Sequence, residues 1–300
     1  MAGESYYRGY SKEELERQYD IESSVPDFPA YADRYKRETE RVQRTLKVQR
    51  DIRYGAHLLE LLDIYPAGVP NAPVQVYFHG GGWRASSKNV RGFPAESFVQ
   101  AGATFVAVDY PLAPQASMDD IVAGARRAIA WLWRHIEDHG GDPRKIYVSG
   151  NSAGAHLAGM LIASGWHERF DVPADVVKGM AGISGAYDLE PHSLTDVRGY
   201  LNLDPGKVRR NSPIRNLPAS PLPVVLAVGA DEPAEYLRQT RDYRTALATC
   251  GIDAVLLELP GHNHFSIIGE LNRPGGALLS AILAQMGLRS PGTATAADAS

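Results

Sequence analysis

Short apolar blocks recur along the chain from about residue 46, and longer stretches with a helical period separate them. In residues 118–139, for example, Ile121, Ala125 and Ile129 follow the three-to-four-residue spacing of a buried helix face. This patterning predicts strands at 46–54, 57–66, 73–80, 103–111, 145–150, 176–185, 223–230 and 254–261. It predicts helices at 94–100, 118–139, 152–164, 235–249 and 265–286.

The order of these elements predicts the fold class. The first two strands form a hairpin around Gly55, and strands then alternate with helices. Short apolar strands between amphipathic helices indicate an α/β fold with a mostly parallel, doubly wound sheet covered on both faces. Ligands of such sheets bind beyond the carboxyl ends of the strands, so the chemistry is expected in the loops there.

Two segments interrupt the alternation, residues 1–45 and 186–220. The first is polar and rich in Tyr, with helical stretches near 11–20 and 30–45, and the second is rich in Pro, Asn and Asp. We expect both to cover the strand ends as a small cap. The whole chain, 1–300, is expected to be one domain with its core at about 46–288 and a disordered polar tail at 289–300.

The composition argues against several kinds of binding partner and metal site. The chain has 300 residues, 44% of them hydrophobic, and a formal net charge of −4 without a dense basic run, so no nucleic-acid partner is expected. One cysteine, Cys250, excludes an intrachain disulfide and a four-cysteine metal site. No signal peptide and no apolar run of about 18 residues is recognised, so we expect no membrane partner and a cytoplasmic protein. No cofactor is expected, and a homodimer is left open.

Chemistry-bearing residues follow four of the predicted strands. In chain order they comprise a glycine-rich loop, a serine between glycines, two acids and a histidine pair: His79-Gly80-Gly81-Gly82-Trp83, Gly150-Asn151-Ser152-Ala153-Gly154, Asp231-Glu232 and His262-Asn263-His264. A nucleophile, an acid and a histidine in this order on a strand–helix alternation are associated with α/β-hydrolases.

Each of these residue types has a chemical reason. A serine hydroxyl is a weak nucleophile and needs a base, for which histidine has a suitable pKa, and an acid must orient that histidine. Glycines on both sides of Ser152 allow a tight strand-to-helix turn. We expect activity to fall when His264 becomes protonated.

At the level of whole motifs the chain resembles the hormone-sensitive-lipase-like branch of α/β-hydrolases, through HGGGW, DYPLAP and GNSAG. Within it, the chain is similar to the arylformamidase (kynurenine formamidase) group, through LDIYP, SGAYDLEP, EYLRQT and HFSII, over roughly residues 57–270. The resemblance implies that Ser152 is the nucleophile and His264 the base. It also implies an oxyanion hole formed by Gly80, Gly81 and Ala153.

The acid that orients His264 is either Asp231 or its neighbour Glu232. Lipase-like relatives place it at Asp231, and formamidase-like relatives at Glu232, which EYLRQT favours. Asn151 stands where lipase-like relatives usually have Asp and many formamidases have His. The third glycine of the HGGGW loop, Gly82, replaces a bulkier residue of formamidases.

The other histidines are expected to have structural roles. His79 is expected to orient the glycine loop, and His156 to pack. The pair His262 and His264 lacks a third ligand, so no metal is expected. Candidate pocket residues are Gly82, Trp83, Asn151 and Tyr187.

The functional hypothesis is a serine hydrolase that cleaves a small amide or ester, arylformamidase-like, through an acyl-enzyme. A carboxylesterase for short-acyl or aryl esters is the alternative. A non-catalytic binding protein with the same fold is the remote one.

Overall fold

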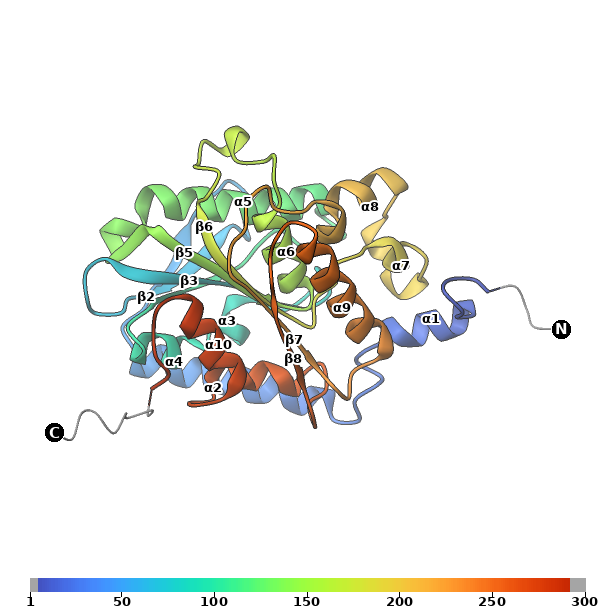
Figure 1. The fold of residues 1–300 in the computed structure, drawn as a ribbon. Helices are drawn as coiled ribbons and strands as arrows, with labels where there is room; N and C mark the ends of the chain where they lie inside the picture. Colours follow the sequence, from blue (N-terminus) through green and yellow to red (C-terminus); the bar gives the residue numbers. More distant parts are fainter. Residues whose placement is uncertain (1–4, 292–300) are drawn as a thin grey trace.

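The computed structural model describes residues 5–291, which form one eight-stranded sheet with helices on both faces (Figure 1). The strand order is β1-β2-β4-β3-β5-β6-β7-β8, and only the pairs β1–β2 and β2–β4 are antiparallel. The strands are β1 (Gln49–Arg53), β2 (Leu61–Tyr65), β3 (Ala72–Phe78), β4 (Thr104–Val108), β5 (Gly141–Asn151), β6 (Val177–Ile183), β7 (Val224–Gly229) and β8 (Val255–Leu259). The predicted hairpin and doubly wound sheet are confirmed.

Two apolar layers enclose the sheet because successive strand residues point to opposite faces. Val76 and Phe78 of β3 belong to a cluster with residues of α5 (Met118–His135), α6 (Ala153–Ile162) and α9 (Ala234–Ala248). Tyr77, between them, belongs to a second cluster with residues of α2 (Phe28–Thr45), α4 (Ala95–Gln100) and α10 (Ala277–Gln285). Shorter elements are α3 (Lys88–Arg91) and the 3-10 helices η1 (Ile136–His139) and η2 (Glu168–Phe170).

The prediction of one helix over 265–286 is wrong. The segment contains the 3-10 helix η5 (Ser266–Asn272), an irregular link, and then α10. The link contains Pro274 and Gly275, and Gly275 has φ +72°. Proline lacks the N–H that a helix needs, and a left-handed glycine ends a helix, so the two together break the element.

The first cap segment contains α1 (Lys12–Tyr19) and α2, and the second contains α7 (Glu190–Ser193), η3 (Asp196–Leu201), α8 (Pro205–Asn211) and η4 (Pro213–Arg215). The two segments contact each other directly. Lys12 Nζ lies 2.7 Å from Asp196 Oδ2, and Arg198 Nη2 donates to the carbonyl of Tyr19 at 2.9 Å. Segments far apart in the sequence thus form one layer.

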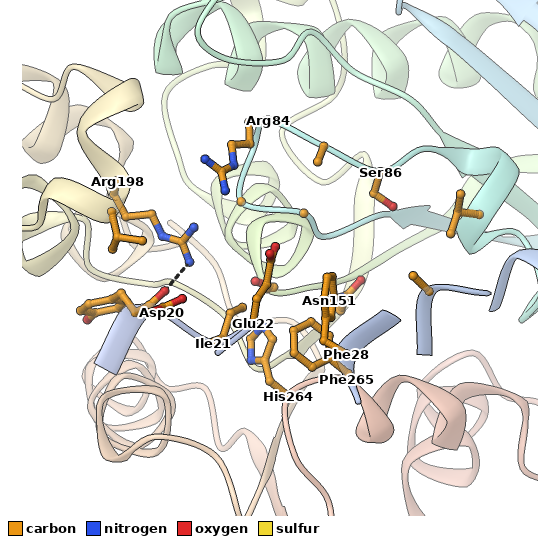
Figure 2. Close-up of a pocket in the computed structure, with 18 of the residues that line it drawn as sticks. Asp20, Ile21, Glu22, Phe28, Arg84, Ser86, Asn151, Arg198, His264 and Phe265 are labelled. Atoms are coloured by element: carbon orange, nitrogen blue, oxygen red, sulfur yellow. Dashed lines mark hydrogen bonds between the residues drawn. The ribbon is translucent and has the colours of Figure 1, made fainter. Parts of the chain in front are cut away.

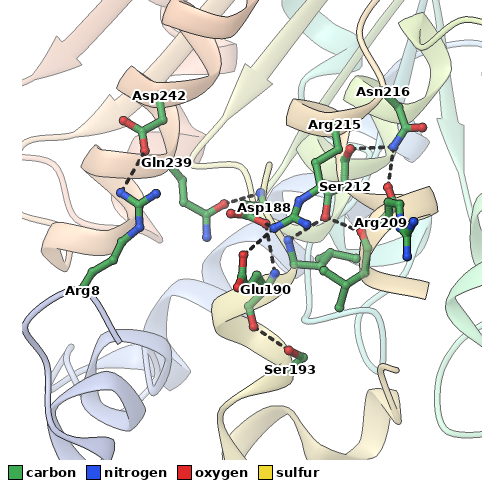
Figure 3. Close-up of polar contacts among 12 residues, drawn as sticks. Arg8, Asp188, Glu190, Ser193, Arg209, Ser212, Arg215, Asn216, Gln239 and Asp242 are labelled. Carbon is green, nitrogen blue, oxygen red and sulfur yellow. Dashed lines mark hydrogen bonds and ion pairs between the residues drawn. The ribbon is translucent and has the colours of Figure 1, made fainter. Parts of the chain in front are cut away.

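The second segment is also tied to α9 and to itself (Figure 3). The Asp188 N–H donates to Gln239 Oε1 of α9 at 2.8 Å, and the Leu189 N–H donates to Ser212 Oγ at 3.0 Å. Arg215 forms ion pairs with Asp188 and Glu190. These contacts fix the segment over the carboxyl ends of β6 and β7, where a site is expected.

Part of one prediction falls outside the described residues. The expected disordered tail, 289–300, lies outside them from residue 292 onward. Across 5–291, no helix combines the length and apolarity needed to cross a membrane.

Candidate active site

Ser152 occupies the turn between β5 and α6. It has φ 53° and ψ −119°, a backbone conformation that is rare for a residue with a side chain, and its N–H donates to the carbonyl of Ile183 at 2.8 Å. A Cβ on Gly150 would overlap the backbone of Gly154, and a Cβ on Gly154 would overlap the carbonyl of Phe78. The flanking glycines are therefore required by close packing of the backbone, as the spacing predicts.

His264 follows β8 and contacts Glu232, which follows β7. The Nδ1 of His264 lies 2.6 Å from Oε2 of Glu232, and both side chains are buried. The other ring nitrogen, Nε2, has no hydrogen-bond partner among the described residues. With an ionised Glu232, the proton of the neutral imidazole lies on Nδ1 and Nε2 is a free acceptor, as a general base requires.

The second oxygen of Glu232 is held by two donors. The hydroxyl of Ser184 donates to Oε1 at 2.5 Å, and the N–H of Gly229 donates to it at 2.7 Å. The neighbouring Asp231 is exposed. Of the two candidate acids, the structure therefore brings Glu232 to His264, and not Asp231.

Ser184 was not among the predicted site residues. It is the first residue after β6, has φ 52°, and lies at the same edge of the sheet as the other candidates. In the sequence it lies near the end of the strand predicted at 176–185, at the strand ends where the other candidates were sought.

The glycine-rich loop is fastened to the serine turn through Asn151. Its Oδ1 accepts hydrogen bonds from the N–H of Gly80 at 2.9 Å and from the Tyr77 hydroxyl at 2.7 Å. The N–H of Gly80 is thereby engaged, which corrects the expectation of a free oxyanion donor at that residue. The N–H of Gly81 donates to no backbone carbonyl of the described residues. Ala153 is the first residue of α6, where an N–H group lacks an intrahelical partner, so both remain as backbone donors.

Two further histidines are positioned as predicted. His79 Nδ1 lies 2.7 Å from the carbonyl of Gly80, so His79 orients the glycine loop. His156 is buried, with Nε2 2.6 Å from the carbonyl of Asn211, and its Nδ1 accepts from Trp83 Nε1 at 3.1 Å. Burial lowers the pKa of His156 to about 4, so it is neutral at pH 7 and serves in packing.

Ser152 and His264 line one cavity of about 250 Å³ (Figure 2). In Figure 2, Phe28, Phe265 and His264 lie opposite Arg84 and Ser86, with Asn151 between the two groups. The cap segments supply much of the remaining wall, which includes Tyr19, Asp20, Ile21, Glu22, Phe28, Ala32, Val197 and Arg198. The segments expected to cover the strand ends thus enclose the candidate catalytic residues.

Two of the four predicted pocket residues line this cavity, and two do not. Gly82 and Asn151 belong to its wall. Trp83 does not, because its indole turns into the core toward His156. Tyr187 does not either, because its ring is buried against Tyr243 with centroids 4.3 Å apart.

The histidine pair shows no metal-site geometry. His262 Nε2 lies 3.6 Å from Glu270 Oε1, and His264 is engaged by Glu232. Within residues 5–291, no three His, Cys, Asp or Glu side chains are grouped so that they could hold a metal ion.

Comparison with known proteins gives the family. The sequence pattern of the alpha/beta hydrolase fold matches residues 75–267, which include Ser152, Glu232 and His264. The chain belongs to the α/β-hydrolase family.

Two similar proteins indicate its type, and a solved structure shows the same fold. The chain is 33% identical to a kynurenine formamidase of Danio rerio over 94% of this chain and 99% of that protein. It is 31% identical to the esterase LipQ of Mycobacterium tuberculosis over 71% of this chain and 56% of that protein. The fold matches the carboxylesterase EstE1 from a metagenomic library with a TM-score of 0.68 and 19% identity, over 93% of this chain and 97% of that one. This α/β-hydrolase is thus an enzyme of the arylformamidase or esterase type.

Proposed function

We propose that this α/β-hydrolase is a serine hydrolase that cleaves small aryl formamides, with Ser152 as nucleophile, His264 as general base and Glu232 as the acid. The observation that carries the proposal is the 2.6 Å contact between Glu232 and His264, because the His264 side chain lines the same cavity as Ser152. The likeness to a kynurenine formamidase along 94% of the chain supports the formamide.

In the first half of the reaction, Ser152 Oγ attacks the formyl carbon while His264 Nε2 takes the hydroxyl proton. The carbonyl oxygen becomes an oxyanion, which the N–H groups of Gly81 and Ala153 stabilise; one such donor contributes about 2.7–4 kcal/mol to lowering a barrier of this kind. Glu232 stabilises the imidazolium through Nδ1. The intermediate collapses when His264 gives the proton to the departing arylamine, leaving a formyl ester on Ser152.

In the second half, water replaces the amine. His264 Nε2 takes a proton from the water, whose oxygen attacks the formyl ester. The new tetrahedral intermediate releases Ser152 Oγ, which regains its proton from His264, and formate departs. Each half uses the same base and the same oxyanion donors, so no cofactor is needed.

The second candidate is a carboxylesterase, favoured by the likeness to the esterase LipQ. The chemistry of the serine is the same, and the two differ in acyl and leaving group. A panel of aryl formamides, the matching acetanilides and p-nitrophenyl esters separates them. A steep preference for formyl over acetyl supports the formamidase, and faster turnover of acetyl and butyryl esters supports the esterase.

Labelling with a fluorophosphonate tests the nucleophile under both alternatives. The folded wild-type protein should be labelled and Ser152→Ala should not. Labelling that persists in Ser152→Ala would contradict the assignment.

The cellular setting belongs to the same proposal. A single cysteine, Cys250, suits a reducing, cytoplasmic compartment, and a net charge of −4 provides no basic surface for nucleic acid.

A further inference from the structure

The loop that carries His264 is held by bonds within the loop and by contacts from elsewhere. Within the loop, Asn263 Oδ1 accepts hydrogen bonds from the N–H groups of Phe265 and Ser266 at 3.0 and 2.8 Å. These local bonds shape the turn, but they move with it and do not fix its position relative to Ser152. That position depends on contacts from residues distant in the sequence.

Helix α2 supplies such contacts on both sides of His264. The hydroxyl of Tyr35 donates to the carbonyl of Phe265, the residue after His264, at 2.8 Å. The hydroxyl of Tyr31 accepts a hydrogen bond from Nδ2 of Asn263, the residue before His264, at 3.3 Å. The two tyrosines are four residues apart, so they lie on the same face of α2. One helix face therefore contacts both neighbours of the histidine.

The same face of α2 also packs against the aromatic ring beside His264. The ring centroid of Phe28 lies 4.7 Å from that of Phe265, and the ring centroid of Tyr31 lies 6.1 Å from it. In Figure 2, Phe28 and Phe265 lie on the His264 side of the cavity. Positions 28, 31 and 35 thus form one stripe of α2 along the histidine loop.

Tyr35 is itself held by residues outside the histidine loop. Its side chain is buried, its ring stacks on Phe93 with centroids 4.7 Å apart and planes 8° apart, and the guanidinium of Arg91 lies 4.9 Å from the ring centroid. Burial raises the pKa of Tyr35 to about 12, so the phenol keeps its proton at neutral pH and remains a donor. The hydroxyl that meets the Phe265 carbonyl therefore has a fixed position.

We propose that Tyr31 and Tyr35 are positioning residues, which hold the backbone on both sides of His264 so that its Nε2 faces Ser152. The role of His264 as base rests on the proposed function, whereas the contacts to its loop do not. Glu232 orients the imidazole through Nδ1, but one hydrogen bond to the ring fixes the ring only if the backbone that carries it is also fixed. Neither tyrosine lines the cavity, so both act through the loop and not through contact with a substrate.

Steady-state rates on an aryl formamide and a p-nitrophenyl ester test this role. Tyr35→Phe keeps the buried ring and removes the donor. It should lower kcat about ten- to a hundredfold and leave KM nearly unchanged, because a misplacement of about 1 Å can cost a reaction about 10²-fold. Tyr31→Phe removes the longer hydrogen bond and should have the smaller effect. The double variant should lose more activity than either single variant.

Proton NMR measures the orientation of the histidine without turnover. The Nδ1–H of His264, in a 2.6 Å hydrogen bond to the Glu232 carboxylate, should resonate far downfield in the wild type, and His264→Ala assigns the signal by removing it. Tyr35→Phe should shift or broaden this signal, because the imidazole loses its fixed orientation. The signal tests the positioning role whichever bond the enzyme cleaves. Failure of the proposed function would appear separately, as full activity of His264→Ala.

Tyr54→Phe provides the matched control for stability. The buried hydroxyl of Tyr54 also donates to a backbone carbonyl, that of Asp109 at 2.6 Å, but it does not contact the histidine loop. Both substitutions should lower the melting temperature by a similar amount, and only Tyr35→Phe should move the His264 signal. An unmoved signal in Tyr35→Phe would overturn the proposal and leave Tyr35 a purely structural role. A raised KM with unchanged kcat would overturn it too, because it would assign the tyrosine to substrate binding.

Discussion

Glu232 meets His264 through one carboxylate oxygen, 2.6 Å from Nδ1, while its other oxygen is fixed by Ser184 and the Gly229 N–H. The carboxylate therefore has one orientation, and so does the imidazole that depends on it. Asp231, one residue earlier, is exposed. This difference between neighbours makes the acid assignment testable by two conservative substitutions.

Glu232→Gln should lower kcat by about 10⁴, because an amide can favour the wrong histidine tautomer and does not stabilise the imidazolium. Asp231→Asn is the matched control and should change kcat no more than a few-fold. Steady-state rates on one aryl formamide and one p-nitrophenyl ester measure both. A larger loss in Asp231→Asn would transfer the role to Asp231.

Asn151 should matter for both stability and catalysis. Asn151→Ala leaves the Gly80 N–H and the Tyr77 hydroxyl without their acceptor, and a buried unsatisfied group costs about 1–3 kcal/mol. We expect a lower free energy of unfolding in urea and a lower kcat/KM, because the glycine loop loses its anchor. Asn151→Asp keeps an acceptor oxygen and should recover part of both; equal losses in the two variants would contradict the anchoring role.

The strand–helix alternation, the cap segments and the strand-end loops could be predicted because each depends on local periodicity or on the edge that parallel strands share. The shared edge also made Ser152 and His264 candidates, because each follows a predicted strand. The break near Pro274 was missed because the apolar positions before and after it were joined into one helix, although residues 272–276 contain no apolar side chain and include Pro274 and Gly275.

Side-chain partners could not be predicted in the same way. Whether Asp231 or Glu232 contacts His264 depends on the turn after β7, which puts one side chain inside and the next outside. The engagement of the Gly80 N–H by Asn151 joins residues 71 positions apart. Trp83 and Tyr187 were expected near the pocket because of their chain positions, but their rings turn into the core.

The glycines around the serine turn give a sharp test of backbone packing. Gly154→Ala places a methyl group against the carbonyls of Phe78 and His79, which cannot move without disturbing the sheet. The expected loss of unfolding free energy is about 3 kcal/mol, the upper end for overpacking. Gly199→Ala is the control, since a Cβ there meets no atom within 4 Å, and its change should stay within about 0.5 kcal/mol. Urea denaturation measures both, and a tolerated Gly154→Ala would show that the turn can relax.

Buried neutral histidines should make the fold sensitive to acid. The pKa of His156 is lowered by burial from 6.5 to about 4, so the folded state binds this proton less readily than the unfolded state. The contribution of neutral His156 to the free energy of unfolding is complete above about pH 6.5 and is lost as the pH falls toward 4. It amounts to about 3 kcal/mol, because one unit of pKa shift corresponds to about 1.4 kcal/mol. Burial lowers the pKa of His192 too, and its effect has the same sign.

The variant His156→Gln tests how much His156 contributes to the loss of stability in acid. Glutamine does not titrate in this range, so the unfolding free energy of the variant should fall less steeply between pH 6.5 and 4 than that of the wild type. Urea denaturation at half-unit pH steps measures the two slopes, and the difference removes the contribution of carboxylates that both proteins share. Identical slopes would mean that His156 does not resist protonation in the folded state, and the hydrogen bond from Trp83 to its Nδ1 would then have to be reassigned.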